Sequence, residues 1–103
     1  MTRPVEITAD ERRIVEDILA RLLPAGYRAY VFGSRATGIR LKPWSDLDLV
    51  IEGPEPLTLS LSGKLAHEFD ECLLPYKVDI VDRMSVRPEF GRIVDASKVP
   101  FWP

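Results

Sequence analysis

Hydrophobic residues recur at intervals of three and four near the start of the chain, the spacing that is typical of an amphipathic helix. This pattern predicts a helix over residues 9–23, with an apolar stripe made of Ile14, Val15, Ile18, Leu19, Leu22 and Leu23. Thr8 and Glu11 have the spacing of a capping box, which satisfies backbone N–H groups at a helix start. Pro24 follows the stripe and is expected to end the helix.

Helical spacing returns in residues 58–73, whose apolar positions are Leu61, Leu65, Phe69 and either Cys72 or Leu73. Residues 85–95 predict a shorter helix with Pro88 near its first turn, where proline is tolerated. A very short helix is also expected to begin at Ser34.

Three segments rich in branched and aromatic residues predict strands, at 27–32, 46–52 and 76–81. Residues 37–45 lack periodicity and contain Gly38, so we expect a loop. The order is then helix, strand, short helix, strand, helix, strand, helix. It predicts an α/β (α+β) fold with a small, twisted, mixed sheet of three or four strands and helices mainly on one face.

The length and composition of the chain limit what it can be. With 103 residues there is room for one hydrophobic core, so we expect one domain over residues 1–103, with acceptor selection residing elsewhere. No apolar run is long enough to span a membrane, and a net charge of −2 argues against general nucleic-acid binding. Cys72 is the single cysteine and no secretory leader opens the sequence, so we expect a cytoplasmic protein.

Three aspartates interrupt segments that otherwise have the composition of strands, where aspartate is disfavoured. Asp46 and Asp48 stand in Ser-Asp-Leu-Asp-Leu-Val-Ile, and Asp79 stands in Val-Asp-Ile-Val. Alternation along a strand puts Asp46 and Asp48 on one face, about 6 to 7 Å apart. Convergence with Asp79 would be costly without cations, so we predict that all three are catalytic carboxylates that bind divalent metal, most plausibly Mg²⁺. Asp82 falls on the opposite face and is expected to be a solvated or capping carboxylate.

A glycine and a serine follow the first predicted strand. Gly33 lets the backbone approach a phosphate closely, and Ser34 adds a hydroxyl donor where a helix opens, so both are predicted to bind a triphosphate. Arg35, Arg40 and Lys42 surround this turn, and Arg35 and Lys42 are further candidates for phosphate contact. The chain lacks the P-loop and Rossmann patterns, which excludes those nucleotide-binding sites.

Together these motifs resemble a known family. Gly33-Ser34, then Asp-x-Asp at Asp46 and Asp48, then Asp79 on a later strand are similar to the minimal nucleotidyltransferases of the DNA polymerase beta superfamily. The resemblance implies that Asp46 and Asp48 bind two metal ions, Mg²⁺ or alternatively Mn²⁺, and that Asp79 binds the catalytic ion beside the attacking hydroxyl. It implies transfer of a nucleoside monophosphate, with ATP as the expected donor.

The resemblance also implies a partner. The segments Tyr-Val-Phe-Gly-Ser-Arg and Lys-Pro-Trp-Ser-Asp-Leu-Asp-Leu are similar to bacterial and archaeal catalytic subunits encoded beside a helical-bundle protein. That partner is a substrate-binding subunit in some cases and a HEPN toxin in others, which an antitoxin silences by adenylylation. We therefore expect a homo- or hetero-oligomer rather than a chain that acts alone.

Three alternatives compete with this interpretation. The chain could be a non-catalytic subunit that neutralises its partner by binding, although its intact motifs argue against that. A stand-alone transferase for a small molecule such as an aminoglycoside would need more chain to hold the acceptor. A template-directed polymerase would need a more basic surface.

Two apolar features remain open at the level of sequence. Trp44 either stacks on a nucleobase or anchors its loop. The tail, residues 99–103, either folds back onto the domain or docks a partner, and we favour folding back.

Overall fold

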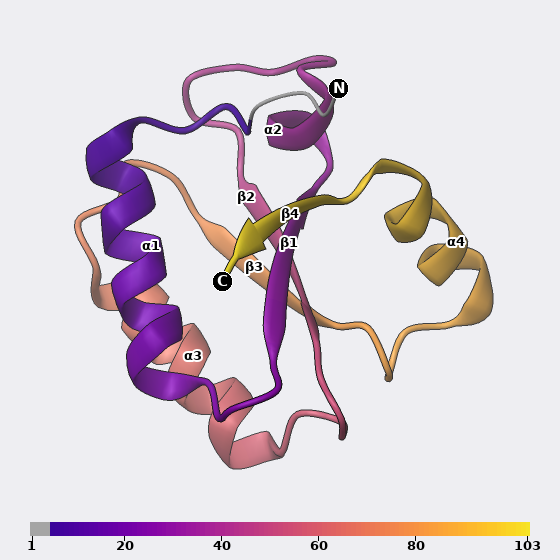
Figure 1. Ribbon diagram of the computed structural model, residues 1–103. Coiled ribbons are helices and arrows are strands. Elements are labelled where there is room, and N and C mark those ends of the chain that lie inside the picture. The colour runs from indigo at the N-terminus through magenta and orange to yellow at the C-terminus, as the bar shows by residue number, and fades with distance from the viewer. Residues whose placement is uncertain (1–4) are drawn as a thin grey trace.

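The computed structural model describes residues 5–103 and contains four helices and four strands within them (Figure 1). In chain order the elements are α1 (Ala9–Leu22), β1 (Arg28–Phe32), α2 (Ser34–Thr37), β2 (Leu47–Glu52), α3 (Leu59–Glu71), β3 (Val78–Asp82), α4 (Pro88–Ser97) and β4 (Val99–Trp102). The predicted mixed α/β fold is confirmed, with β4 as the fourth strand.

Local chemistry accounts for where the helices begin. The Thr8 side chain accepts a hydrogen bond from the Glu11 backbone while Glu11 accepts one from the Thr8 backbone, which is the predicted capping box. Thr58 caps α3 with its side chain alone, which accepts a hydrogen bond from the Leu61 backbone. Pro88 occupies the first turn of α4, so this helix begins three residues later than the predicted start at residue 85.

The sheet has the strand order β3-β2-β1-β4 and is mixed. Strand β1 pairs antiparallel with both β2 and β4, whereas β2 pairs parallel with β3. The parallel pair is connected through α3, which lies on one side of the sheet in Figure 1. Strand β3 is therefore an edge strand, and the tail folds back as the strand at the opposite edge.

Most of the hydrophobic core lies between the sheet and the layer formed by α1 and α3 (Figure 1). Alternate residues of β2 face this core, and Leu47, Leu49 and Ile51 are almost completely buried. The opposite face of the sheet carries a smaller cluster in which Val94 of α4 packs on Phe32 and Val50. The two longest helices thus share one face, as predicted, and α4 covers part of the other.

Ion pairs connect α4 to the central sheet. The Lys98 ammonium group contacts the Glu52 carboxylate at the end of β2 and lies 3.0 Å from Asp95 Oδ1. Arg83 donates two hydrogen bonds to the Asp95 carboxylate, at 3.0 and 2.8 Å. These bonds, together with the contact from Lys98, hold the pKa of the Asp95 carboxyl far below its ordinary value. Within residues 5–103, no helix is both long enough and apolar enough to cross a membrane.

Candidate active site

Two of the predicted carboxylates are neighbours across a pair of parallel strands. Asp48 of β2 and Asp79 of β3 are register partners, so their side chains leave the sheet on the same face. This is the face of Val50, opposite the main core. Asp46 precedes β2 in an exposed position, because the strand begins one residue later than predicted, at Leu47.

The electrostatics of Asp48 reflect this arrangement. Burial and, after it, the negative charges of Asp79 and Asp46 together raise the pKa of the Asp48 carboxyl to about 6. Lys77 places a cation beside this pair, since its Nζ lies 3.5 Å from Asp79 Oδ1. Lys77 was not among the predicted residues, although its position two before Asp79 already placed it on the same face.

The donor set fits a hard divalent cation in its chemistry, because carboxylate oxygens are the ligands that such cations prefer. A carboxylate whose pKa is raised by burial and by two like charges is also a group that a bound cation would stabilise. Over residues 5–103, however, no three acidic, imidazole or thiol side chains converge into a complete metal-binding group. The structure pairs Asp48 with Asp79, and Asp46 acts on Asp48 from the preceding loop.

Gly33 brings the predicted phosphate turn against these carboxylates. It follows Phe32, the register partner of Asp48, and has the backbone angles φ 74° and ψ −154°. Only glycine adopts this conformation readily, and a Cβ atom at this position would overlap Asp48 Oδ2. Ser34 then begins α2. The turn and the carboxylate predicted from separate motifs are therefore in direct contact.

A family model described as "Nucleotidyltransferase domain" matches residues 12–101. The chain belongs to this family.

Relatives of this nucleotidyltransferase domain carry more specific names. "Probable protein adenylyltransferase MntA" of Haemophilus influenzae is 38% identical over 90 residues, which cover 87% of this chain and 77% of the relative. A solved structure described as a toxin-antitoxin with AMP-PNP matches with a TM-score of 0.72 at 23% identity, over 88% of this chain and 72% of that one.

Another solved structure contains a tri-AMPylated HEPN toxin of Shewanella oneidensis in complex with an MNT antitoxin. It matches with a TM-score of 0.62 at 22% identity, over 88% of this chain and 71% of that one. At these identities the two solved structures support a common fold.

The Arg35 side chain of the nucleotidyltransferase domain makes hydrogen bonds to backbone that its position in the sequence did not predict. This side chain is buried and donates hydrogen bonds to the backbone carbonyl groups of Ser45, Glu6 and Pro43, at 2.9, 2.8 and 3.1 Å. The guanidinium also lies 3.8 Å from the centroid of the Tyr76 ring. These contacts give Arg35 a structural role, and its contact with phosphate stays a prediction.

The loop before Asp46 carries the other basic candidate. Lys42 is exposed, and its ammonium group lies 5.7 Å from the centroid of the Trp44 ring. Trp44 is 67% exposed, so its ring is not packed into the domain as a loop anchor. Contact between Lys42 and phosphate, and stacking of Trp44 on a base, stay predictions.

Asp82 serves as a cap, in agreement with the expectation for this residue. Its carboxylate accepts hydrogen bonds from the Leu57 backbone at 2.9 Å, the Ser85 hydroxyl at 2.8 Å and the Met84 backbone at 3.1 Å. Asp82 therefore fixes the segment before α3 and the turn after β3, and it is not one of the paired carboxylates.

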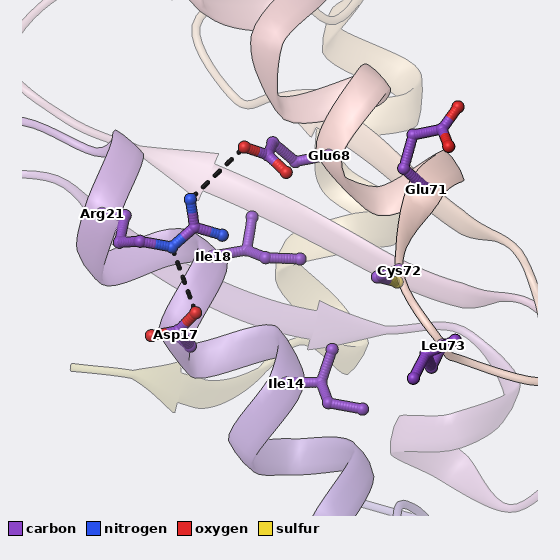
Figure 2. Close-up of a pocket in the computed structure, with 8 residues that line it drawn as sticks. All are labelled: Ile14, Asp17, Ile18, Arg21, Glu68, Glu71, Cys72 and Leu73. Carbon is purple, nitrogen blue, oxygen red and sulfur yellow. Dashed lines mark hydrogen bonds and ion pairs between the residues drawn. The ribbon is translucent and has the colours of Figure 1, made fainter.

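A groove of about 290 Å³ lies elsewhere on the nucleotidyltransferase domain, between α1 and α3. Figure 2 shows Arg21 between Asp17 and Glu68, at 3.1 and 3.3 Å, with Ile14 and Ile18 along the same helix. Both helices pack on the face of the sheet opposite Asp48 and Asp79. This groove is therefore separated from the candidate active site by the sheet.

Proposed function

We propose that this nucleotidyltransferase domain transfers a nucleoside monophosphate, AMP from ATP, to a hydroxyl group of a protein partner. The observation that carries the proposal is the register pairing of Asp48 with Asp79, together with the Gly33 turn in contact with Asp48. The 38% identity to a probable protein adenylyltransferase supports the choice of donor and acceptor.

The reaction is an in-line displacement at the α-phosphorus. A bond forms between the acceptor oxygen and phosphorus, the bond to the β,γ-pyrophosphate breaks, and the hydroxyl proton is released. Asp46, Asp48 and Asp79 would hold two divalent ions, Mg²⁺ or alternatively Mn²⁺, which supply stabilisation of the attacking and departing oxygens.

The residues of the chain itself divide the remaining work. Gly33 leaves room for the triphosphate to approach the backbone, and Ser34 offers a hydroxyl donor. Asp79 lies on the edge strand β3, where an acceptor from another molecule has access to its carboxylate. Lys77 beside Asp79 offsets negative charge when no cation is bound.

The acceptor belongs to a separate helical-bundle protein, and the pair works in the cytoplasm as a toxin-antitoxin system. The similarity of fold to an MNT antitoxin bound to a tri-AMPylated HEPN toxin supports this choice of partner.

Release of pyrophosphate tests the proposal. The chain is incubated with ATP, Mg²⁺ and the proposed helical-bundle partner, and pyrophosphate is measured over time. The wild-type chain releases pyrophosphate, whereas Asp46→Ala/Asp48→Ala reduces the rate by about 1,000-fold or more, because the metal ligands are lost. Asp10→Ala, at an exposed position on α1 and on the opposite side of the sheet from the carboxylates, is the matched control and keeps the wild-type rate. Equal rates for wild type and double variant would contradict the proposal and favour a non-catalytic neutralising subunit.

A further inference from the structure

We infer that Arg35 is a positioning residue, which holds the segments carrying Asp46 and Asp79 in place against the Gly33 turn. The inference rests on the proposed function for its catalytic consequence. The contacts that carry it come from three separate parts of the chain.

The first contacts fix the loop that leads to Asp46. The Arg35 Nε donates to the carbonyl of Ser45, the residue directly before Asp46, and one terminal nitrogen donates to the carbonyl of Pro43. These bonds span the end of the 38–45 loop just where the chain enters β2. The peptide group that leads into Asp46 is therefore held by a buried charge.

The second contacts fix the N-terminal segment. The other terminal nitrogen of Arg35 donates to the Glu6 carbonyl at 2.8 Å, and the Glu6 backbone donates to the Arg35 carbonyl at the same distance. This two-way link joins the segment before α1 to α2. It closes one side of the pocket in which the guanidinium is buried.

The third contact reaches the segment before β3. The guanidinium lies over the ring of Tyr76, three residues before Asp79, and the Tyr76 hydroxyl donates to Glu11 at 3.0 Å. The next residue, Lys77, accepts a hydrogen bond from the Leu47 backbone at 2.9 Å. Tyr76 and Lys77 thereby align the start of β3 with the start of β2, where the paired carboxylates lie.

Arginine is needed for this combination of contacts. Its planar guanidinium carries five N–H donors in a fixed fork and can also present a flat face to an aromatic ring. A lysine ammonium group could bond one or two of the carbonyls but could not reach all three while stacking on Tyr76. Since Arg35 follows Ser34 directly, the same residue connects the phosphate turn with both carboxylate segments.

Binding of Mn²⁺ tests this role without relying on turnover. Mn²⁺ affinity is measured by electron paramagnetic resonance in the presence of AMP-PNP, per folded molecule as judged by circular dichroism. Arg35→Lys is expected to weaken Mn²⁺ binding by about 10- to 100-fold, the usual effect of losing a group that orients metal ligands. A merely structural role would lower the melting temperature and leave the affinity of the folded fraction unchanged.

Arg12→Lys is the matched control. Arg12 also donates to a backbone carbonyl, that of Phe101, and lies 4.2 Å from the centroid of an aromatic ring, but it contacts neither carboxylate segment. It should keep wild-type Mn²⁺ affinity. If Arg35→Lys does not fold, Tyr76→Leu replaces it, because this variant removes the aromatic ring beneath the guanidinium. Its Mn²⁺ affinity is then compared with that of the wild-type chain.

The outcomes distinguish failure of the positioning role from failure of the proposed function. Wild-type Mn²⁺ affinity in folded Arg35→Lys, or in Tyr76→Leu when that variant is the one that decides, overturns the positioning role and leaves the proposed function standing. A wild-type chain that binds neither Mn²⁺ nor AMP-PNP contradicts the proposed function, and this inference with it.

Discussion

Asp48 carries a charge that the fold makes unfavourable. Its pKa is raised from an unfolded value near 3.8 to about 6 by burial and by the neighbouring Asp79 and Asp46. Between these two pH values the folded chain binds more protons at this group than the unfolded chain. The contribution of Asp48 to folding stability is therefore present at low pH and is lost as pH rises from about 4 to above 6.

Because the Asp48 charge destabilises the fold at neutral pH, removing that charge should stabilise the protein. With metal removed by EDTA, Asp48→Asn should raise the melting temperature by a few degrees at pH 7, and the gain should shrink toward zero near pH 4. Thermal unfolding at several pH values measures it, with Asp70→Asn, at an exposed position on α3, as control. A gain that is the same at every pH would contradict the role assigned to the Asp48 charge.

Gly33 makes a second prediction at the scale of one residue. Gly33→Ala should destabilise the fold by about 1–3 kcal/mol, because the new Cβ meets Asp48 and the positive φ becomes strained. Urea unfolding measures the loss, and AMP-PNP binding should weaken in parallel. Gly63→Ala is the matched control, since Gly63 lies in α3 with open space around it and should gain up to about 1 kcal/mol. Similar effects at both glycines would argue against a special Gly33 conformation.

The sequence predicted the roles of some residues and not of others. Asp48 and Asp79 stood out in the sequence because aspartate is disfavoured in strands, and Gly33 stood out because it lies between a strand and a short helix. Asp82 was correctly separated from them by strand alternation. The role of Arg35 depends on carbonyl groups of Glu6, Pro43 and Ser45, which come together only when the chain folds, so no local pattern could reveal it.

At the scale of elements, amphipathic spacing and capping were sufficient for the two long helices. The strand that the sequence left open is β4, whose four residues include Pro100. Proline cannot donate to a strand ladder and is tolerated at a sheet edge, which is where β4 lies. The apolar tail was correctly expected to fold back, but its antiparallel pairing with β1 depends on tertiary contacts.

Phe101 makes the importance of β4 measurable. It is 4% exposed, packs in the main core and accepts the Arg12 hydrogen bond through its carbonyl. Phe101→Ala should lower the free energy of unfolding by about 3 kcal/mol or more, through lost burial and a residual cavity. Pro100→Ala, at an exposed position in the same strand, should change it by less than about 1 kcal/mol. Urea unfolding compares the two, and equal effects would show that β4 does not pack as described.

At the scale of the whole molecule, the arrangement of the sheet separates two surfaces. The α1 and α3 layer covers the main core, while the carboxylates lie on the other face beside the open edge of β3. An acceptor carried by another protein can approach Asp79 from that edge without disturbing the core. Under the proposed function, this edge is where the partner that carries the acceptor would bind.

The central claim is that the paired carboxylates transfer AMP to that partner. The most direct measurement is the intact mass of the helical-bundle protein after incubation with this chain and Mg²⁺, separately with each nucleoside triphosphate. The account predicts a gain of one or more AMP units with ATP, abolished by EDTA and by Asp46→Ala/Asp48→Ala. An unchanged partner mass with the wild-type chain, alongside full neutralisation of the partner, would contradict it.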